Sequence, residues 1–173
     1  MKIKYLIIVI TVILIGIGGA LIMRNKRKPI INNDELEASN IKSIYLTYTN
    51  GYMMNAYTRY QLIIENDKYI AKIKPYGVDE NDILEIEVSK DLMEEISKVL
   101  KKYEVGKWDG FDKTDQGVLD GDSFSFSVLL NNDKDISASG YMKWPKNYGN
   151  VVGEISLLFM NIYNKEKGIN ENE

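Results

Sequence analysis

An uncharged apolar run near the start of the chain constrains its fold more than any other feature. Residues 5–23 read YLIIVITVILIGIGGALIM, without one charged side chain. As an α-helix rising about 1.5 Å per residue, this segment would be about 28 Å long, close to the ~30 Å hydrocarbon core of a bilayer. Its glycines are compatible with a span, because transmembrane helices tolerate glycine. We therefore expect residues 1–23 to form an N-terminal membrane anchor with one transmembrane helix.

A cleaved signal peptide is the alternative for the same segment. Lys2 and Lys4 form a short basic region before the apolar run, and residues 18–20 offer a poor cleavage site. Apolar residues continue past that point, which favours retention. The basic residues that follow the run would keep the domain in the cytoplasm if the positive-inside rule acted alone. The order of basic and apolar segments is that of an export signal, so we expect an extracytoplasmic domain on the cell membrane.

The chain beyond the apolar run is acidic. All 25 acidic residues lie at or after Asp34, whereas only 16 of the 22 basic residues lie after Pro29, which leaves a net charge of about −9 on this part. Nucleic acid and anionic lipid headgroups repel such a surface, so we expect neither as a partner. The expected contacts are the membrane, through the N-terminal helix, and an envelope protein or a wall polymer.

The chain contains no cysteine and no histidine. This excludes thiol nucleophiles, disulfides, lipid-carrying cysteines, thiolate zinc sites and imidazole bases, and with them every Ser-His-Asp triad. Chemistry based on carboxylates, lysine, tyrosine or serine remains possible. We expect no cofactor, and the composition favours a binding protein over an enzyme.

Six segments alternate apolar and polar residues with the period of two that is typical of half-buried strands. They span residues 41–49, 55–65, 68–74, 83–88, 122–130 and 134–141. Turn residues separate several of them, at Asn50-Gly51, Asn66-Asp67 and residues 131–133. Because hairpins connect most of these strands and each strand has a polar face, we expect an antiparallel sheet.

Two further segments have helical periodicity. The first follows Ser89, an expected N-cap, and ends with Lys101 and Lys102. The second follows Pro145, and its apolar residues recur at helical spacing from Val151 onward.

The order of these elements predicts an α+β fold. We expect a two-layer domain over residues 41–164, with an antiparallel sheet of about six strands and two helices on one face. Residues 24–40 are expected to form a juxtamembrane linker, residues 104–121 a long loop, and residues 165–173 a frayed tail.

The expected long loop concentrates aspartates in the segment WDGFDKTDQGVLDGD. Hard cations such as Ca²⁺ take several oxygen ligands from a flexible loop, which makes Asp109, Asp112, Asp120 and Asp122 candidate metal ligands. Their spacing does not match an EF-hand, and a solvated loop in which Asp and Gly set the turns is the favoured interpretation. Two of these carboxylates could also serve as acid and base in glycoside hydrolysis.

Aromatic residues gather at a proline corner between the last strand and the last helix. Tyr141, Trp144 and Tyr148 lie in the segment GYMKWPKNYG. Exposed rings around a rigid turn can form a binding platform, and the alternative is an aromatic plug that closes the core. Trp108 and Phe111, in the aspartate-rich loop, have the same two interpretations. These five residues are the candidate ligand-binding residues.

The last two strands and the corner also match a wider pattern, in which a strand hairpin leads to a glycine, a Pro-x-x-Tyr corner and a final helix. The matching residues are Gly121, Asp122, Ser123, Phe124, Gly140, Pro145 and Tyr148. Over residues 108–162 the chain thereby resembles a family of uncharacterised Gram-positive (Firmicutes-type) exported or membrane-anchored proteins. The resemblance implies an envelope location and supplies no catalytic residue. Many such proteins carry a lipid-attachment cysteine, which this chain lacks.

Three functions follow as hypotheses. The first is a membrane-anchored cell-envelope binding or interaction module without catalytic activity. The second is an envelope inhibitor or immunity-type protein whose acidic loop reaches a basic active site. The third is a carboxylate-dependent glycan hydrolase. Two aspartates converging in a pocket would favour the third, and a protruding acidic loop would favour the second.

Overall fold

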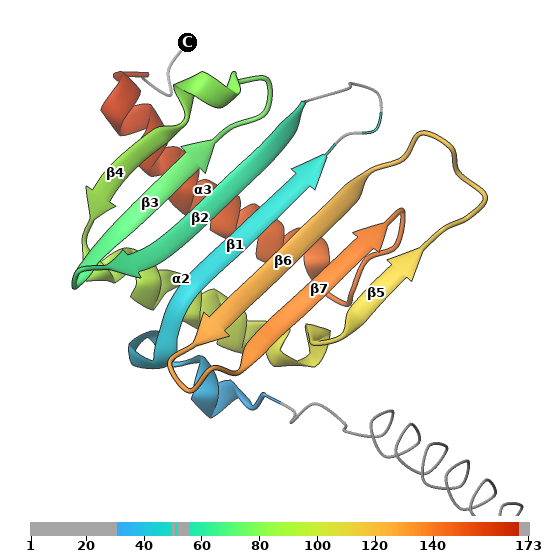
Figure 1. The fold of residues 1–173 in the computed structure, drawn as a ribbon, viewed down its shortest axis with the longest axis horizontal. Coiled ribbons are helices and arrows are strands. Elements are labelled where there is room, and N and C mark those ends of the chain that lie inside the picture. Colours follow the sequence, from blue (N-terminus) through green and yellow to red (C-terminus); the bar gives the residue numbers. More distant parts are fainter. Residues whose placement is uncertain (1–30, 50, 52–55, 170–173) are drawn as a thin grey trace, which may run out of the picture.

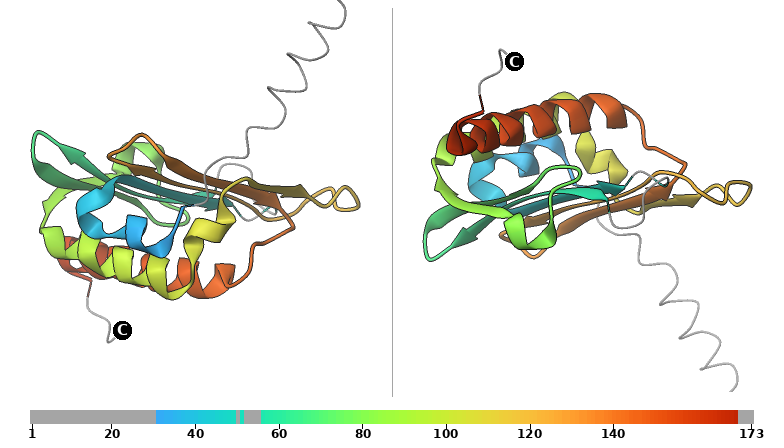
Figure 2. Two further views of the ribbon diagram at one scale, coloured as in Figure 1. Left: turned by 90° about the horizontal axis from the view of Figure 1, so that it is seen from below. Right: turned by 90° about the horizontal axis from the view of Figure 1, so that it is seen from above.

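Seven strands form one sheet in the order β4-β3-β2-β1-β6-β7-β5 (Figure 1). The structure is a computed structural model that describes residues 31–49, 51 and 56–169. The strands are β1 (Ile41–Thr49), β2 (Tyr57–Glu65), β3 (Lys68–Lys74), β4 (Leu84–Val88), β5 (Phe111–Thr114), β6 (Ser123–Leu130) and β7 (Asp135–Tyr141). Helices α2 (Lys90–Lys102) and α3 (Tyr148–Lys167) both cover the same face of the sheet (Figure 2). The expected α+β fold is confirmed.

The sheet is mixed, whereas the sequence predicted an antiparallel one. Six strands coincide with the six expected segments and pair antiparallel. The seventh, β5, lies within the expected loop over residues 104–121 and pairs parallel with β7, with Phe111 opposite Ala138. The same stretch also holds a 3₁₀ helix, η4 (Val105–Trp108). Strand β5 has four residues, and only Phe111 among them is partly buried. Its sequence therefore shows no alternation of buried and exposed residues.

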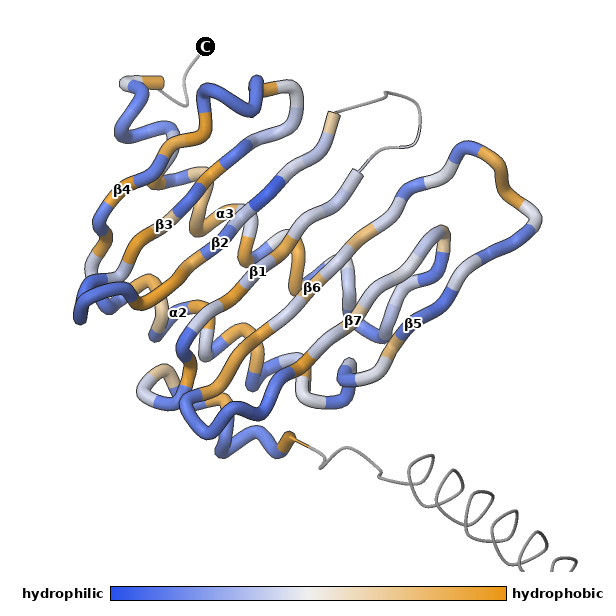
Figure 3. Tube along the Cα trace, viewed as in Figure 1, coloured by the Kyte–Doolittle hydropathy of each residue, from blue (hydrophilic) through white to orange (hydrophobic). Residues whose placement is uncertain are grey.

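Alternation along the strands places the core between the sheet and the helices (Figure 3). In β1 and β6, Leu46 lies opposite Phe126 and both side chains are buried. The stripe of α3 contributes Phe159, whose ring stacks on Tyr60 of β2 with centroids 5.0 Å apart. Burying a side chain of this size stabilises the fold by roughly 1.5–3 kcal/mol. The opposite face of the sheet carries serine, threonine and charged residues, and no described element covers it.

Helix α2 begins after Ser89, as the sequence predicted. The Ser89 hydroxyl donates to Asp91 at 3.1 Å and does not cap the backbone of the helix. The apolar stripe of α2 is buried at Leu92, Met93, Ile96, Val99 and Leu100.

The chain joins the core before β1. Two short 3₁₀ helices, η1 (Asn33–Leu36) and η2 (Ala38–Asn40), precede the sheet. Ile31 and Leu36 are buried, and the Ser97 hydroxyl of α2 donates to the Leu36 carbonyl at 2.6 Å. From residue 31 onward, the segment expected to be a linker therefore packs on the domain. At the other end, α3 continues to Lys167, beyond residue 165 where a frayed tail was expected.

The expected membrane anchor, residues 1–23, lies outside the described residues. Between residues 31 and 169, none of the helices that the structure describes is both long and apolar enough to cross a bilayer. The anchor and the side of the membrane stay predictions.

Candidate functional site

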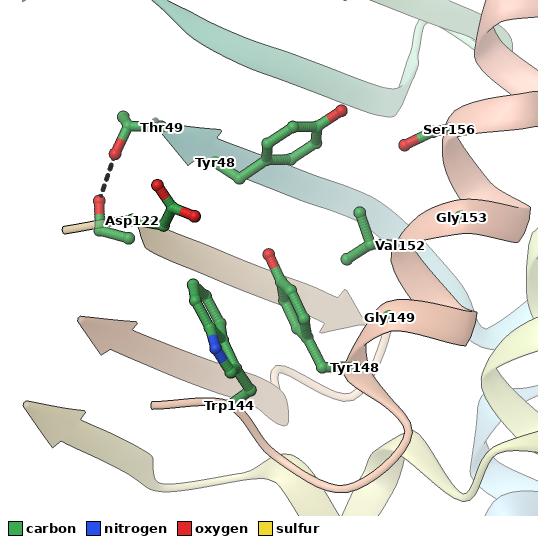
Figure 4. A pocket seen from close by; sticks show the side chains of 10 residues that line it. Tyr48, Thr49, Asp122, Trp144, Tyr148, Gly149, Val152, Gly153 and Ser156 are labelled. Carbon is green, nitrogen blue, oxygen red and sulfur yellow. Dashed lines mark hydrogen bonds between the residues drawn. The ribbon is translucent and has the colours of Figure 1, made fainter. Parts of the chain in front are cut away.

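A pocket of about 430 Å³ opens between the N-terminal half of α3 and the neighbouring ends of β1 and β6 (Figure 4). This volume lies in the range of small-ligand sites, about 300–1,000 Å³. Strand β1 supplies two lining residues, the loop before β6 one, the first residue of β6 one, the corner after β7 one, and α3 five. They are Tyr48, Thr49, Asp122, Ser123, Trp144, Tyr148, Gly149, Val152, Gly153 and Ser156.

Two stacked rings form one wall of the pocket. The ring centroids of Trp144 and Tyr148 are 4.8 Å apart, and their planes differ by 23°. Trp144 is 40% exposed, while Tyr148 is half-buried and packs on Phe124, with centroids 4.6 Å apart. Beneath them Trp108 is buried, and its indole N–H donates to the Lys146 carbonyl at 3.1 Å. The wall is thus fixed from below and open toward solvent at Trp144.

The corner after β7 sets the position of this wall. Gly140 has no room for a side chain, because a Cβ there would lie 2.6 Å from the Phe124 ring and closer still to the Lys143 carbonyl oxygen. Asn147 then has a positive φ of 64° and precedes the first turn of α3. The buried ring of Pro145 lies between these two positions. The tight turn therefore brings Trp144 back over the end of the sheet beside Tyr148.

Asp122 carries the only formal charge among the described residues that line the pocket. Within the described residues, the one hydrogen bond to its side chain comes from the Gly51 backbone N–H at 3.3 Å. Its backbone is held more firmly, since its carbonyl accepts from the Met142 N–H at 2.9 Å. Beside it, the Thr49 and Ser123 hydroxyls share a hydrogen bond of 2.6 Å. The backbone beside β6 therefore positions this carboxylate, and the described residues occupy only one of its hydrogen-bonding sites.

Tyr48 and Ser156 bring hydroxyl groups to the pocket lining, and both interact with the buried Tyr60 beside it. Burial, followed by the nearby Tyr48, raises the pKa of Tyr60 well above its ordinary value. Burial also raises the pKa of Tyr148, and the charges of Tyr48 and Asp122 add to that rise. Both phenols therefore stay protonated at neutral pH and can donate hydrogen bonds. Ser156 Oγ is buried and partly offsets the rise in the pKa of Tyr60, although no described residue bonds to it at ordinary hydrogen-bond geometry.

Two glycines of α3 keep the pocket open. A Cβ added at Gly149 or at Gly153 would meet nothing within 4 Å. Packing therefore does not require glycine at either position, and glycine inside a helix costs about 1 kcal/mol relative to alanine. The two residues are one helical turn apart, so the missing side chains leave one continuous hollow beside the aromatic wall (Figure 4).

The structure brings together three of the residues that the sequence singled out. Trp144, Tyr148 and Asp122 line the pocket. Trp108 and Phe111 lie in the layer beneath it, where Phe111 is 6.2 Å from the Phe124 ring. Tyr141 lies apart from the pocket, and its hydroxyl donates to the Leu119 carbonyl at 2.8 Å.

The four candidate metal ligands do not converge. Asp109 accepts a hydrogen bond from a β7 backbone N–H at 3.2 Å, and Asp112 accepts one from a β7 serine hydroxyl at 2.9 Å. Asp120 is exposed in the loop before β6, while Asp122 faces the pocket. In the part of the chain that the structure describes, no three acidic side chains are grouped as a metal ion would need.

The sequence reasoning missed the α3 side of the pocket and its β1 wall. Neither Tyr48 of β1 nor Gly149, Gly153 and Ser156 of α3 was singled out from the sequence. The sequence did contain a signal, because two glycines four residues apart in a helix leave a side-chain-free strip on one face of that helix. Such a strip indicates either close packing or an open space.

No protein-family model and no curated protein matches the chain. The resemblance to uncharacterised Gram-positive exported proteins thus rests on its quoted residues alone, of which Asp122, Ser123 and Tyr148 line the pocket.

Proposed function

We propose that this chain is a membrane-anchored binding module of the cell envelope, without catalytic activity, that takes one group of its ligand into the α3 pocket. The lining is suited to binding, since aromatic rings supply apolar contact area and the few polar groups can orient a ligand. The exposed edge of Trp144 would be the first surface that a ligand meets.

The proposal rests mainly on the unfilled space beside Gly153. This glycine lies inside a twenty-residue helix, where alanine would fit without any contact and would stabilise the helix by about 1 kcal/mol. If this part of α3 had only a structural role, alanine at this position would make the protein more stable. Local choices that lower stability without improving packing are expected where a site is functional.

The pocket supports binding better than glycan hydrolysis. Hydrolysis of glycosides uses two carboxyl groups about 5–9.5 Å apart on either side of the scissile bond. The residues that line this pocket include one carboxylate, Asp122. Asp115 and Asp120 of the same loop are not among these lining residues, and Asp115 is paired with Lys143 at 2.7 Å.

A fragment screen tests the proposal. The full chain, kept in dodecyl maltoside, should show fragment-dependent shifts in the amide NMR signals of Gly149 and Gly153, with a change in Trp144 fluorescence. Trp144→Ala should weaken the best fragments at least tenfold, because it removes half of the aromatic wall. Tyr76→Ala is the matched control, since Tyr76 is an exposed aromatic residue outside the pocket lining. A screen without pocket shifts, or equal effects of the two variants, would contradict the proposal.

The envelope location has its own test. If the apolar run over residues 5–23 holds the chain in the membrane with the domain outside, protease added to intact, wall-stripped cells should degrade the domain. We expect this because the apolar run and the basic residues before it have the order of an export signal, which directs the domain that follows across the membrane. Complete protection until the cells are lysed would contradict this orientation.

An inhibitor or immunity-type function is a second candidate. The loop between β5 and β6 projects beyond the sheet (Figure 2), and Leu119 within it is 95% exposed. A projecting loop with an apolar residue beside aspartates could enter the active site of a partner enzyme. Such an inhibitor needs no ligand in the α3 pocket, so the fragment screen separates the two candidates.

A further inference from the structure

We infer that the group bound in the α3 pocket is an organic cation, an alkylammonium group. This inference rests on the proposed function and adds the chemical class of the ligand. Among the described residues that line the pocket, Asp122 contributes the single formal charge, and none is a lysine or an arginine. A cation would therefore meet an attractive charge, whereas an anion would lose its hydration and meet a repulsive one.

Among the described residues, the carboxylate of Asp122 also has no counter-ion. The described residues give Asp122 no ion pair, and its side chain has one long hydrogen bond, 3.3 Å, from a backbone N–H. Lys143, a basic residue of the corner, is paired with Asp115 at 2.7 Å. A half-buried carboxylate with this little compensation gains most from a ligand that supplies the positive charge.

Aromatic rings surround the space in front of this carboxylate. Tyr48 comes from β1, Trp144 and Tyr148 come from the corner that leads into α3, and all three line the pocket (Figure 4). The faces of aromatic rings attract cations, with about 0.5–1 kcal/mol at exposed sites and about 2 kcal/mol when the pair is desolvated. Rings combined with one carboxylate favour an ammonium group that carries carbon substituents, because its apolar shell contacts the rings while its charge faces the carboxylate.

A bare metal ion fits this lining poorly. Calcium takes six to eight oxygen ligands and magnesium six, several of them carboxylates in a typical site. Here the lining described by the structure offers one carboxylate and the hydroxyls of Thr49, Ser123 and Ser156, and the first two of these hydroxyls already bond to each other. The other lining residues are aromatic rings, glycines and a valine. The ammonium group could belong to a small free compound or to a lysine side chain of a peptide or protein, and both share the chemistry that the pocket would recognise.

Three probes of nearly the same shape test the inference on the full chain in dodecyl maltoside. Choline carries a trimethylammonium group, 3,3-dimethyl-1-butanol replaces it by an uncharged tert-butyl group, and 3,3-dimethylbutanoate carries a negative charge. Affinities come from NMR titration of Gly149 and Gly153. We expect choline to bind at least tenfold more tightly than the neutral alcohol, and the anion more weakly still. A peptide with one central lysine, titrated in parallel against choline, identifies which source of the ammonium group is preferred.

Asp122→Asn should remove the preference, lowering the affinity for choline at least tenfold while the neutral alcohol binds as before. Asparagine keeps an oxygen that can accept from the Gly51 N–H, so the fold should persist. Asp120→Asn is the matched control, because Asp120 is an exposed aspartate of the same loop and lies outside the pocket lining. Equal or tighter binding of the neutral or anionic probe, or a preference that survives in Asp122→Asn, would overturn the inference. If only neutral fragments bind in the pocket, that result supports the proposed binding function and contradicts only the inference that the ligand is a cation.

Discussion

Replacing Phe126 by aspartate should abolish folding of the domain. Phe126 is 1% exposed, and the Trp108 ring meets it edge-on with centroids 5.3 Å apart. Removing a buried phenylalanine side chain costs about 3–5 kcal/mol, and burying an unpaired carboxylate costs several more. Together these costs approach the whole stability of an ordinary domain, about 5–15 kcal/mol. Far-ultraviolet circular dichroism of the purified chain, followed through a urea titration, measures the loss directly.

The adjacent residue provides the control. Ser125 faces the uncovered side of the sheet, opposite Thr47 on β1 and Ser139 on β7. Ser125→Asp places the same charge one residue away but leaves it in water, so the free energy of unfolding should change by no more than about 1 kcal/mol. Comparable damage from both substitutions would contradict the strand assignment and the location of the core.

Most of the sheet could be predicted because its strands are long enough to show alternation. Strand β6 is the clearest case, with Phe124, Phe126 and Val128 buried between partly exposed serines. The sequence around Asn66-Asp67 likewise predicted a tight hairpin, and both residues have positive φ. In these elements the local pattern and the tertiary burial agree, which is the condition under which sequence reasoning works.

Strand β5 could not be predicted because its stabilisation is not local. Its four residues contain one partly buried side chain, Phe111. The strand is held by pairing with β7, which follows it by more than twenty residues, and by the hydrogen bond from Ser139 to Asp112. A parallel neighbour of this kind leaves no periodic signal in a four-residue segment.

The pocket was visible in the sequence only as separate parts. The aromatic corner and Asp122 were singled out for different reasons, a platform and a metal site. Their meeting depends on the register of β1 and β6, which places Tyr48 opposite Phe124 and Thr49 opposite Ser123. It also depends on how α3 crosses the sheet after the corner, and neither the register nor the crossing can be read from local spacing.

Gly153→Leu tests the central claim, that the hollow beside α3 is a binding site, most directly. The leucine side chain would enter space that no described atom occupies within 4 Å of its Cβ, so the helix should form at least as well as before. We expect the free energy of unfolding to stay equal or to rise by up to about 1 kcal/mol, because leucine favours a helix over glycine. Binding of choline and of the best fragments should fall at least tenfold, because the side chain fills the pocket.

Asn161→Leu, at an exposed position further along α3, adds the same side chain away from the pocket and should leave binding unchanged. The measurement is one NMR titration of the three proteins with the same probe, combined with their urea unfolding curves. A stable Gly153→Leu protein that no longer binds is the result that a binding site at this hollow predicts. A stable Gly153→Leu protein that binds as tightly as the unaltered chain would contradict it.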